Sequence, residues 1–279
     1  MLIHTNNQLK KFYLKCQKHK IVAVDTEFYR VDTYYPVLCL IQLANLDEII
    51  LIDPLEEKID LKILGKIFKS NSILKVFHAA SQDLEIFFNL YKQIPNNIID
   101  TQICIALLGL SDSLGYADSL KLFLKKKIDK SFQFIDWRKR PLSVNKVNYA
   151  INDVKYLIPL YKKILKIMQK DKIKLNIKKS HKKILIKKSY IKSPNLAWEK
   201  LKIINHENYR LSLLKEICKQ REKIAKKLNV PIKRIIKDQE IKIISNKKTK
   251  TKDVKMIINL IKNESFRQSL KKILIKKNI

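Results

Sequence analysis

Apolar residues in the first 170 positions gather in short, β-branched runs and in longer stretches with helical spacing. Runs at residues 21–28, 37–44 and 48–53 have the length of buried strands, and short polar segments separate them. Consecutive strands with short connections pair most simply as an antiparallel meander. We therefore expect three neighbouring strands early in the chain.

Two further apolar runs, at residues 73–78 and 98–101, predict a fourth and a fifth strand. The apolar positions between the strands recur every three or four residues, as on one face of a helix. This alternation predicts an α/β domain with a mixed sheet flanked by helices. Helices are expected at residues 5–17, 61–68, 82–91, up to 110, 114–124 and about 143–169, with Ser81 and Ser143 as N-caps.

The second part of the chain has a different pattern. Residues 171–193 are rich in lysine and isoleucine, and we expect a basic, partly helical connector that ends before Pro194. Helical spacing then predicts a small all-α unit with helices at residues 209–228, 232–236 and 254–275. The expected organisation is an α/β domain over residues 1–170, a basic linker over 171–205 and a helical domain over 206–279.

The 279 residues carry a formal net charge of +33. Residues 1–170 hold 26 lysines and arginines against 17 acidic residues, and residues 171–279 hold 33 against 9. This excess favours a polyanionic partner, most simply nucleic acid, and its concentration in the second part favours contact with a phosphate backbone. A biased nucleotide composition of the gene is the alternative source of so many lysines.

The composition also excludes several classes of protein. Apolar residues make up 46% of the chain, enough for a packed core. No apolar run is long enough to cross a membrane and the first twenty residues lack a signal-peptide core, so we expect a cytoplasmic protein. The four cysteines lack C-x-x-C spacing, which argues against a zinc site or a disulfide framework. The three glycines form neither a G-x-G-x-x-G nor a Walker A loop.

Asp25 and Glu27 close the first predicted strand. Side chains two residues apart on a strand project from the same face, so the two carboxylates lie side by side. Hard divalent cations such as Mg²⁺ or Mn²⁺ are the usual way to hold such a pair together. Taken alone, a D-x-E sequence is more often a strand running into a polar loop.

Three more residues complete a possible site. Asp83 lies in the first turn of a predicted helix, where the helix dipole favours an acid in any protein. Tyr149 and Asp153 share one helix face, which is also common on solvated helices. Together the four carboxylates match the ligand set for two-metal phosphodiester hydrolysis, with Asp25, Glu27, Asp83 and Asp153 as ligands. Tyr149 would hold the attacking water.

Three groups of motifs carry a family resemblance. They are V-D-T-E-F-Y-R with Y-Y-P and L-I-Q-L, then V-F-H-A-A-S-Q-D-L-E, and then D-W-R-K-R-P-L with Y-A-I-N-D-V-K-Y-L. Over about residues 18–165 the chain resembles ribonuclease D of the DEDD 3′-5′ exonucleases, in the branch with tyrosine in the third motif. The resemblance implies a ribonuclease-H-like fold and two Mg²⁺ or Mn²⁺ ions. It assigns the four carboxylates as metal ligands and Tyr149 as the water-positioning residue.

A weaker resemblance lies in the second part. Residues 196–202 and 213–225 resemble the linker and the start of an HRDC domain, a helical nucleic-acid-binding module. Cys218 stands close to the position where that family tends to have tryptophan. The resemblance implies one such module within residues 206–279.

Four residues are candidates for substrate contact. His78 could touch a phosphate, although a histidine that closes a buried strand is more often a core residue. Arg138 and Lys139, with Arg140, precede the helix that carries Tyr149 and could contact phosphates, or they form an ordinary basic turn. Phe28 could stack on a terminal base or pack in the core.

The resemblance implies a metal-dependent 3′-5′ exoribonuclease that trims tRNA precursors and other structured RNAs and releases nucleoside 5′-monophosphates. No protein partner is evident. The same chemistry on DNA is the nearest alternative, because no residue recognisably reads a 2′-hydroxyl. A nucleic-acid-binding protein with a decayed catalytic domain is another, although such a protein has no need to keep mutually repelling acids together.

Overall fold

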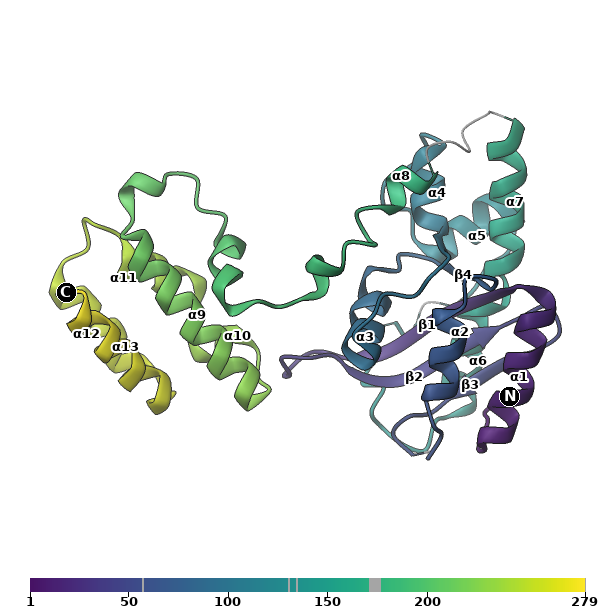
Figure 1. The fold of residues 1–279 in the computed structure, drawn as a ribbon, viewed down its shortest axis with the longest axis horizontal. Helices are drawn as coiled ribbons and strands as arrows, with labels where there is room; N and C mark the ends of the chain where they lie inside the picture. Colours follow the sequence, from purple (N-terminus) through teal and green to yellow (C-terminus); the bar gives the residue numbers. More distant parts are fainter. Residues whose placement is uncertain (57, 130, 134, 171–176, 279) are drawn as a thin grey trace. The chain divides into compact units, whose positions relative to one another are not determined.

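The computed structural model describes residues 1–56, 58–129, 131–133, 135–170 and 177–278 (Figure 1). The chain forms two compact units. The larger unit comprises Met1–Tyr29 and Leu38–Tyr190, and the smaller unit comprises Arg30–Val37 and Ile191–Ile279. Within the described residues, every helix is too short or too polar to cross a bilayer.

The larger unit is built on a mixed sheet with the strand order β3-β2-β1-β4-β5. β2 and β3 pair antiparallel, whereas β1 with β4 and β4 with β5 pair parallel. The predicted mixed sheet is confirmed, and β1 is its central strand. The strands are β1 (Ile21–Tyr29), β2 (Val37–Ala44), β3 (Ile49–Ile52), β4 (Leu74–Phe77) and β5 (Ile98–Asp100).

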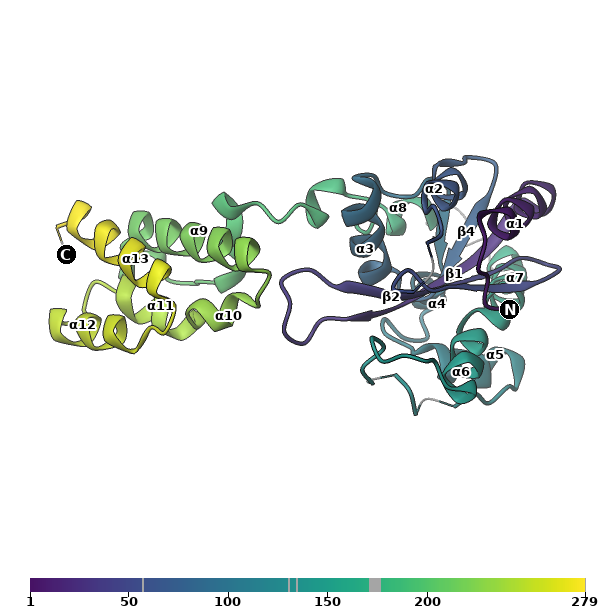
Figure 2. The same cartoon turned by 90° about the horizontal axis from the view of Figure 1, so that it is seen from below.

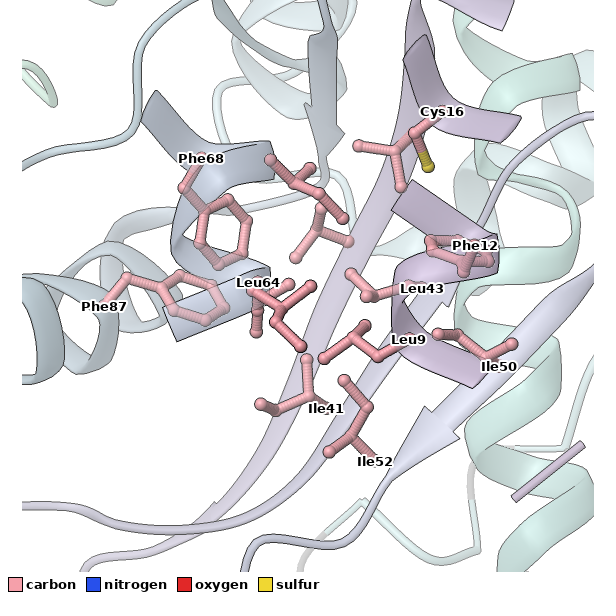
Figure 3. Close-up of a cluster of buried hydrophobic side chains, with 14 of the residues drawn as sticks. Leu9, Phe12, Cys16, Ile41, Leu43, Ile50, Ile52, Leu64, Phe68 and Phe87 are labelled. Carbon is pink, nitrogen blue, oxygen red and sulfur yellow. The ribbon is translucent and has the colours of Figure 1, made fainter. Parts of the chain in front are cut away.

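One face of the sheet packs against α1 (Asn6–His19), α2 (Lys62–Lys69) and α3 (Ser81–Tyr91). Val22 and Val24 of β1 belong to this core. Figure 3 shows how α1, α2 and α3 contribute side chains over β2 and β3. The labelled residues are Leu9, Phe12 and Cys16 of α1, Ile41 and Leu43 of β2, Ile50 and Ile52 of β3, Leu64 and Phe68 of α2, and Phe87 of α3.

The other face carries a second core, in which Ala23 of β1 packs with residues of the later helices. Figure 2 shows α5 and α6 on the side of β1 and β2 opposite to α2 and α3. Because side chains alternate along β1, Asp25 and Glu27 project to the face of Ala23. The helices that supply this core are α4 (Thr101–Leu107), α5 (Tyr116–Leu124), α6 (Val144–Lys155), α7 (Leu157–Lys170) and α8 (Ile177–His181).

Two helix predictions in this unit were wrong in detail. The helix expected over residues 143–169 is broken into α6 and α7 at Tyr156. Pro159 lacks an N–H and its ring conflicts with the carbonyl of Lys155, so the helix cannot continue through this point. Ser81 is not an N-cap, because α3 begins at that residue after Ala80 and has no side-chain cap.

The predicted boundary after residue 170 also differs from the observed units. Residues 171–176 lie outside the described residues, but 177–190 belong to the larger unit. Buried His181 of α8 accepts a hydrogen bond of 2.8 Å from the backbone N–H of Asp100. Tyr190 packs on Phe88 of α3. Much of the expected basic connector is therefore part of the α/β fold.

The smaller unit is all-helical, as predicted, and its core includes Leu214, Ile217, Ile241, Phe266 and Leu270. The single helix expected over 254–275 is two helices, and α11 was not expected. Asn263 interrupts the helix because its side chain caps the second segment. The helices are α9 (Leu211–Leu228), α10 (Ile232–Ile235), α11 (Asp238–Ser245), α12 (Thr251–Leu260) and α13 (Glu264–Lys276), preceded by 3₁₀ turns at Pro194–Leu201 and His206–Asn208.

The segment between β1 and β2 is more than the polar turn that its sequence suggests. Residues Arg30–Val37 belong to the smaller unit. The buried hydroxyl of Tyr34 donates a hydrogen bond of 2.6 Å to Glu222 of α9, and the backbone N–H groups of Tyr34 and Tyr35 donate to Asn229. The segment is thus a structural part of the helical core.

Candidate active site

Three carboxylates converge on the face of the sheet that α6 covers. Asp25 and Glu27 come from β1, which continues past them to Tyr29 instead of closing there as predicted, and Asp153 comes from α6. One carboxylate oxygen of each lies within 4.8 Å of those of the other two. Such a cluster of hard oxygen donors suits a divalent cation. The structure therefore brings together three of the four acids that the sequence predicts as ligands.

The fourth acid, Asp83, has a different immediate partner. It lies in the first turn of α3 and is buried, and its Oδ1 accepts a hydrogen bond of 2.5 Å from the Thr26 hydroxyl. Asp83 is still close enough for its charge to raise the pKa of Glu27 and for the charge of Asp25 to raise the pKa of Asp83. It borders the cluster without sharing its set of converging oxygens.

Burial and mutual repulsion make the acids hard to ionise without a cation. Burial first, and then the charge of Asp25, raises the pKa of Glu27 to about 10. Burial raises the pKa of Asp153 to about 8. Burial and the charge of Asp153 hold the pKa of Asp25 well above its usual range. A divalent cation would supply the missing positive charge, so the donor set and its electrostatics both fit a metal ion.

Tyr149 lies one helical turn before Asp153, which confirms the shared face on α6. Its ring packs against those of Phe132 and Trp137, each with a centroid separation of 5.9 Å. Burial and the charge of Asp153 raise the pKa of its hydroxyl. The phenol therefore stays protonated at neutral pH, and it can orient a water by hydrogen bonding but is a poor base.

The turn that positions α3 depends on Asp100, which the sequence analysis missed. Its buried carboxylate accepts hydrogen bonds from the backbone N–H groups of Ala79 at 3.0 Å, Ala80 at 2.9 Å and Gln102 at 2.8 Å. Ala79 has φ of 60°, a left-handed conformation that costs energy for a non-glycine residue. The hydrogen bonds to Asp100 hold this strained turn and so fix the start of the helix that bears Asp83.

His78 is held by internal contacts. Its Nδ1 lies 2.9 Å from the Thr101 hydroxyl and its Nε2 lies 2.9 Å from the Leu114 carbonyl. Burial lowers the pKa of the imidazole, so it is neutral. Because both ring nitrogens already have protein partners, the geometry favours a structural role over the predicted phosphate contact.

Tyr116, at the start of α5, is a second residue that the sequence analysis missed. Its hydroxyl donates a hydrogen bond of 3.3 Å to the carbonyl of Asn152, next to Asp153. Burial, with the charges of Asp153 and Asp25, raises the pKa of this phenol well above its usual value. Only the folded chain brings this tyrosine to the carboxylates, because nothing in its local sequence marks it.

The basic residues before α6 have separate environments. Arg138 stacks over the ring of Tyr29, 3.3 Å from its centroid, and pairs with Asp136. Lys139 is exposed. The side chain of Arg140 is mostly buried and forms an ion pair with Asp53. The structure thus leaves Arg138 and Lys139 near the surface and removes Arg140 from the candidates for phosphate contact.

Phe28 is half-buried next to Glu27 at the end of β1. Its side chain therefore has both a packed part and an accessible part. Both predicted roles, core packing and base stacking, are compatible with this placement.

Residues 1–169, which carry all of these carboxylates, match the family model described as 3′-5′ exonuclease. The chain belongs to the 3′-5′ exonuclease family. The matched range covers the sheet, the helices α1 to α6, nearly all of α7, and Tyr149. We refer to the larger unit below as the exonuclease unit.

Curated relatives extend the similarity into the smaller unit. The chain is 35% identical over 253 residues to ribonuclease D of Sphingobium indicum, covering 90% of this chain and 65% of that protein. It is 38% identical over 243 residues to ribonuclease D of Bartonella henselae, covering 87% and 60%. The chain thus spans less than two thirds of the length of these relatives.

Solved structures agree with the fold. The crystal structure of Escherichia coli RNase D, described as an exoribonuclease involved in structured RNA processing, is similar with a TM-score of 0.87 and 26% identity, over 100% of this chain and 75% of that one. Brucella melitensis NrnC with bound Mg²⁺ shares the fold alone, with a TM-score of 0.54 and 23% identity over 69% of this chain and 94% of that one. The mixed sheet followed by an all-helical part is thus confirmed.

Proposed function

We propose that this protein is a metal-dependent 3′-5′ exoribonuclease that releases nucleoside 5′-monophosphates. The observation that carries the proposal is the convergence of Asp25, Glu27 and Asp153 within 4.8 Å. The ribonuclease D relatives support RNA as the substrate. In this proposal two Mg²⁺ or Mn²⁺ ions bind Asp25, Glu27, Asp83 and Asp153.

When bound, the two ions supply charge stabilisation for the attacking and leaving oxygens of the phosphodiester. The protein residues provide orientation. The four carboxylates on β1, α3 and α6 would hold the ions, and only through the ions would they place the reacting phosphate. The protonated Tyr149 hydroxyl holds the attacking water in line with the scissile bond, and the aromatic rings of Trp137 and Phe132 fix the direction of that hydroxyl.

The proposed substrates are tRNA precursors and other structured RNAs. The family relatives support this choice, as does the excess of basic residues, which suits counterion release from a phosphate backbone. The smaller unit, which includes residues 206–279, would act as an HRDC-like nucleic-acid-binding domain. Arg138 and Lys139 would contact phosphates of the substrate strand, Phe28 would stack on a terminal base, and the enzyme would work in the cytoplasm.

The test is the release of mononucleotides from a 3′-extended tRNA precursor with Mg²⁺ or Mn²⁺, beside a DNA strand of the same sequence. Wild type should shorten the RNA stepwise. Asp25→Asn should be inactive, and Tyr149→Phe should lose about 100-fold in kcat without losing metal binding. Asp112→Asn, at an exposed acid outside the four proposed ligands, is the matched control and should be fully active.

Each outcome decides a different point. Faster cleavage of the DNA strand would make this a DNA exonuclease with the same site. Binding of both strands without cleavage, in the presence of either cation, would overturn the catalytic proposal and leave a nucleic-acid-binding protein.

A further inference from the structure

The guanidinium of Arg140 donates hydrogen bonds to groups on three segments of the chain. Its Nε donates to Oδ2 of Asp53 at 2.5 Å, and its Nη2 donates to Oδ1 of the same carboxylate at 2.7 Å. Nη2 also donates to the carbonyl of Cys39 on β2, at 2.8 Å. Nη1 donates to the carbonyl of Trp137 at 2.6 Å. The guanidinium therefore ties the segment before α6 to β2 and to the end of β3.

The Trp137 carbonyl matters because hydrogen bonding to the described residues does not hold the indole, whose ring has only the Lys146 ammonium over its face, at 5.9 Å from the centroid. Trp137 is 1% exposed, and among the described residues its Nε1–H has no hydrogen-bond partner. Packing and the position of the backbone therefore fix the ring. The backbone is fixed at this residue by the hydrogen bond from Arg140.

The indole in turn contacts the proposed water-positioning residue. The ring centroids of Trp137 and Tyr149 are 5.9 Å apart with an interplanar angle of 42°. Phe132 covers Tyr149 as well, but it is only half-buried, whereas Trp137 is among the largest fully buried side chains. The indole of Trp137 is therefore held more rigidly than the ring of Phe132, because buried side chains have the least freedom to move.

We propose that Arg140, anchored on Asp53, is a positioning residue that holds Trp137 and thereby orients the Tyr149 hydroxyl for water attack. The predicted effect of this residue on kcat rests on the proposed function, because it requires that the protein is an exoribonuclease. A lysine at this position keeps the charge, but its single nitrogen cannot reproduce the hydrogen bonds that Nε, Nη1 and Nη2 of the planar guanidinium make from three separate positions. Arg140→Lys therefore tests the geometry while it preserves the charge.

The first experiment is a double-mutant cycle on the full chain with single-stranded RNA. Arg140→Lys should lower kcat by about 100-fold, as expected for a misplaced catalytic group, with KM and the Mn²⁺ dissociation constant unchanged. In the Tyr149→Phe background the same substitution should cost less than about two-fold, because the group that it positions is already lost. Leu9→Ala, a core variant in α1 distant in sequence from this network, should lower stability and leave kcat unchanged.

Equal losses in the two backgrounds would overturn the inference, as would a rise in KM or in the Mn²⁺ dissociation constant with kcat unchanged. These results would mean that the Arg140 and Asp53 pair supports the fold without acting on Tyr149.

A second readout does not depend on activity. The chain has two tryptophans, so the variant Trp198→Phe leaves Trp137 as its only fluorophore of this type. Acrylamide quenching of Trp137 should increase several-fold when Arg140→Lys is added to a chain that circular dichroism shows to be folded. Unchanged quenching would overturn the inference even if the enzyme is an exoribonuclease. If wild type is inactive on RNA but Arg140→Lys still increases the quenching of Trp137, the proposed function is wrong and the role of Arg140 in holding Trp137 stands.

Discussion

The hydroxyl of Thr26 donates a hydrogen bond of 2.5 Å to Oδ1 of Asp83, so β1 contacts a third acid from its opposite face. Thr26 stands between Asp25 and Glu27 on the strand, and side chains alternate between faces. β1 thus carries two of the acids itself and contacts Asp83 through the hydroxyl of Thr26. This arrangement keeps Asp83 near the cluster before any cation binds.

Thr26→Val tests this relationship. The substitution keeps the shape but leaves the buried Asp83 carboxyl without its donor, so the metal-free protein should lose about 1–3 kcal/mol in unfolding free energy. Saturating Mn²⁺ should reduce this difference, because Asp83 then gains a new partner. Thermal unfolding with EDTA and with Mn²⁺ measures both values. The same loss in both conditions would show that Asp83 does not become a ligand.

Metal binding should depend on pH in a defined direction. The pKa values of Glu27 and Asp153 are raised to about 10 and about 8, so both carboxyls carry protons at neutral pH and a cation must displace them. The affinity for Mn²⁺ should therefore rise between about pH 6 and pH 9, with release of protons. Isothermal titration calorimetry in two buffers of different ionisation enthalpy measures the protons, and Asp153→Asn should release fewer.

The same shifts predict how the metal-free protein responds to pH. Because the folded state binds more protons than the unfolded chain, its unfolding free energy should fall as pH rises from about 4 to about 8 through both groups, and on to about 10 through Glu27. Urea unfolding with EDTA at several pH values measures this slope. The slope should weaken in Asp153→Asn, and an unchanged slope would contradict the assignment.

Lys75 on β4 predicts a stability change of the opposite sign. It is buried, its ammonium donates to the carbonyls of Ser70 at 2.6 Å and Ile73 at 2.8 Å, and burial lowers its pKa from 10.5 to about 7. The unfolded chain therefore binds more protons between these values, so this residue adds stability as pH rises from about 7 to about 10. The rise should be smaller in Lys75→Met than in the exposed control Lys66→Met when urea unfolding is compared across this range.

Tyr34 should stabilise the helical unit although it lies between two strands of the exonuclease fold. Its hydroxyl is bonded to Glu222, which is 1% exposed. Tyr34→Phe should leave that carboxylate short of a donor and cost about 1–3 kcal/mol. Hydrogen exchange of the α9 amides in the full chain measures the effect. Tyr35→Phe is the control, and equal exchange in the two variants would contradict the role of the hydroxyl.

The local pattern of apolar and polar residues was sufficient to predict where the strands lie, because each strand is a short apolar run between polar segments. The run at 37–44 coincides with β2, and the run at 21–28 differs from β1 by one residue. Helix ends were less predictable. The break at Tyr156 and the cap at Asn263 depend on how single residues compete within a continuous apolar pattern.

By itself the sequence determined that Asp25 and Glu27 share a face and that Tyr149 and Asp153 share another, and it predicted Asp25, Glu27, Asp83 and Asp153 as metal ligands. The shared faces are consequences of the period of a strand and of a helix, which local sequence contains. The tertiary structure alone decided that Asp83 accepts a hydrogen bond from Thr26, that Asp100 holds the turn before α3, and that Arg140 forms an ion pair with Asp53. That last pair is 87 residues apart, and no local periodicity encodes which charge meets which across such a distance.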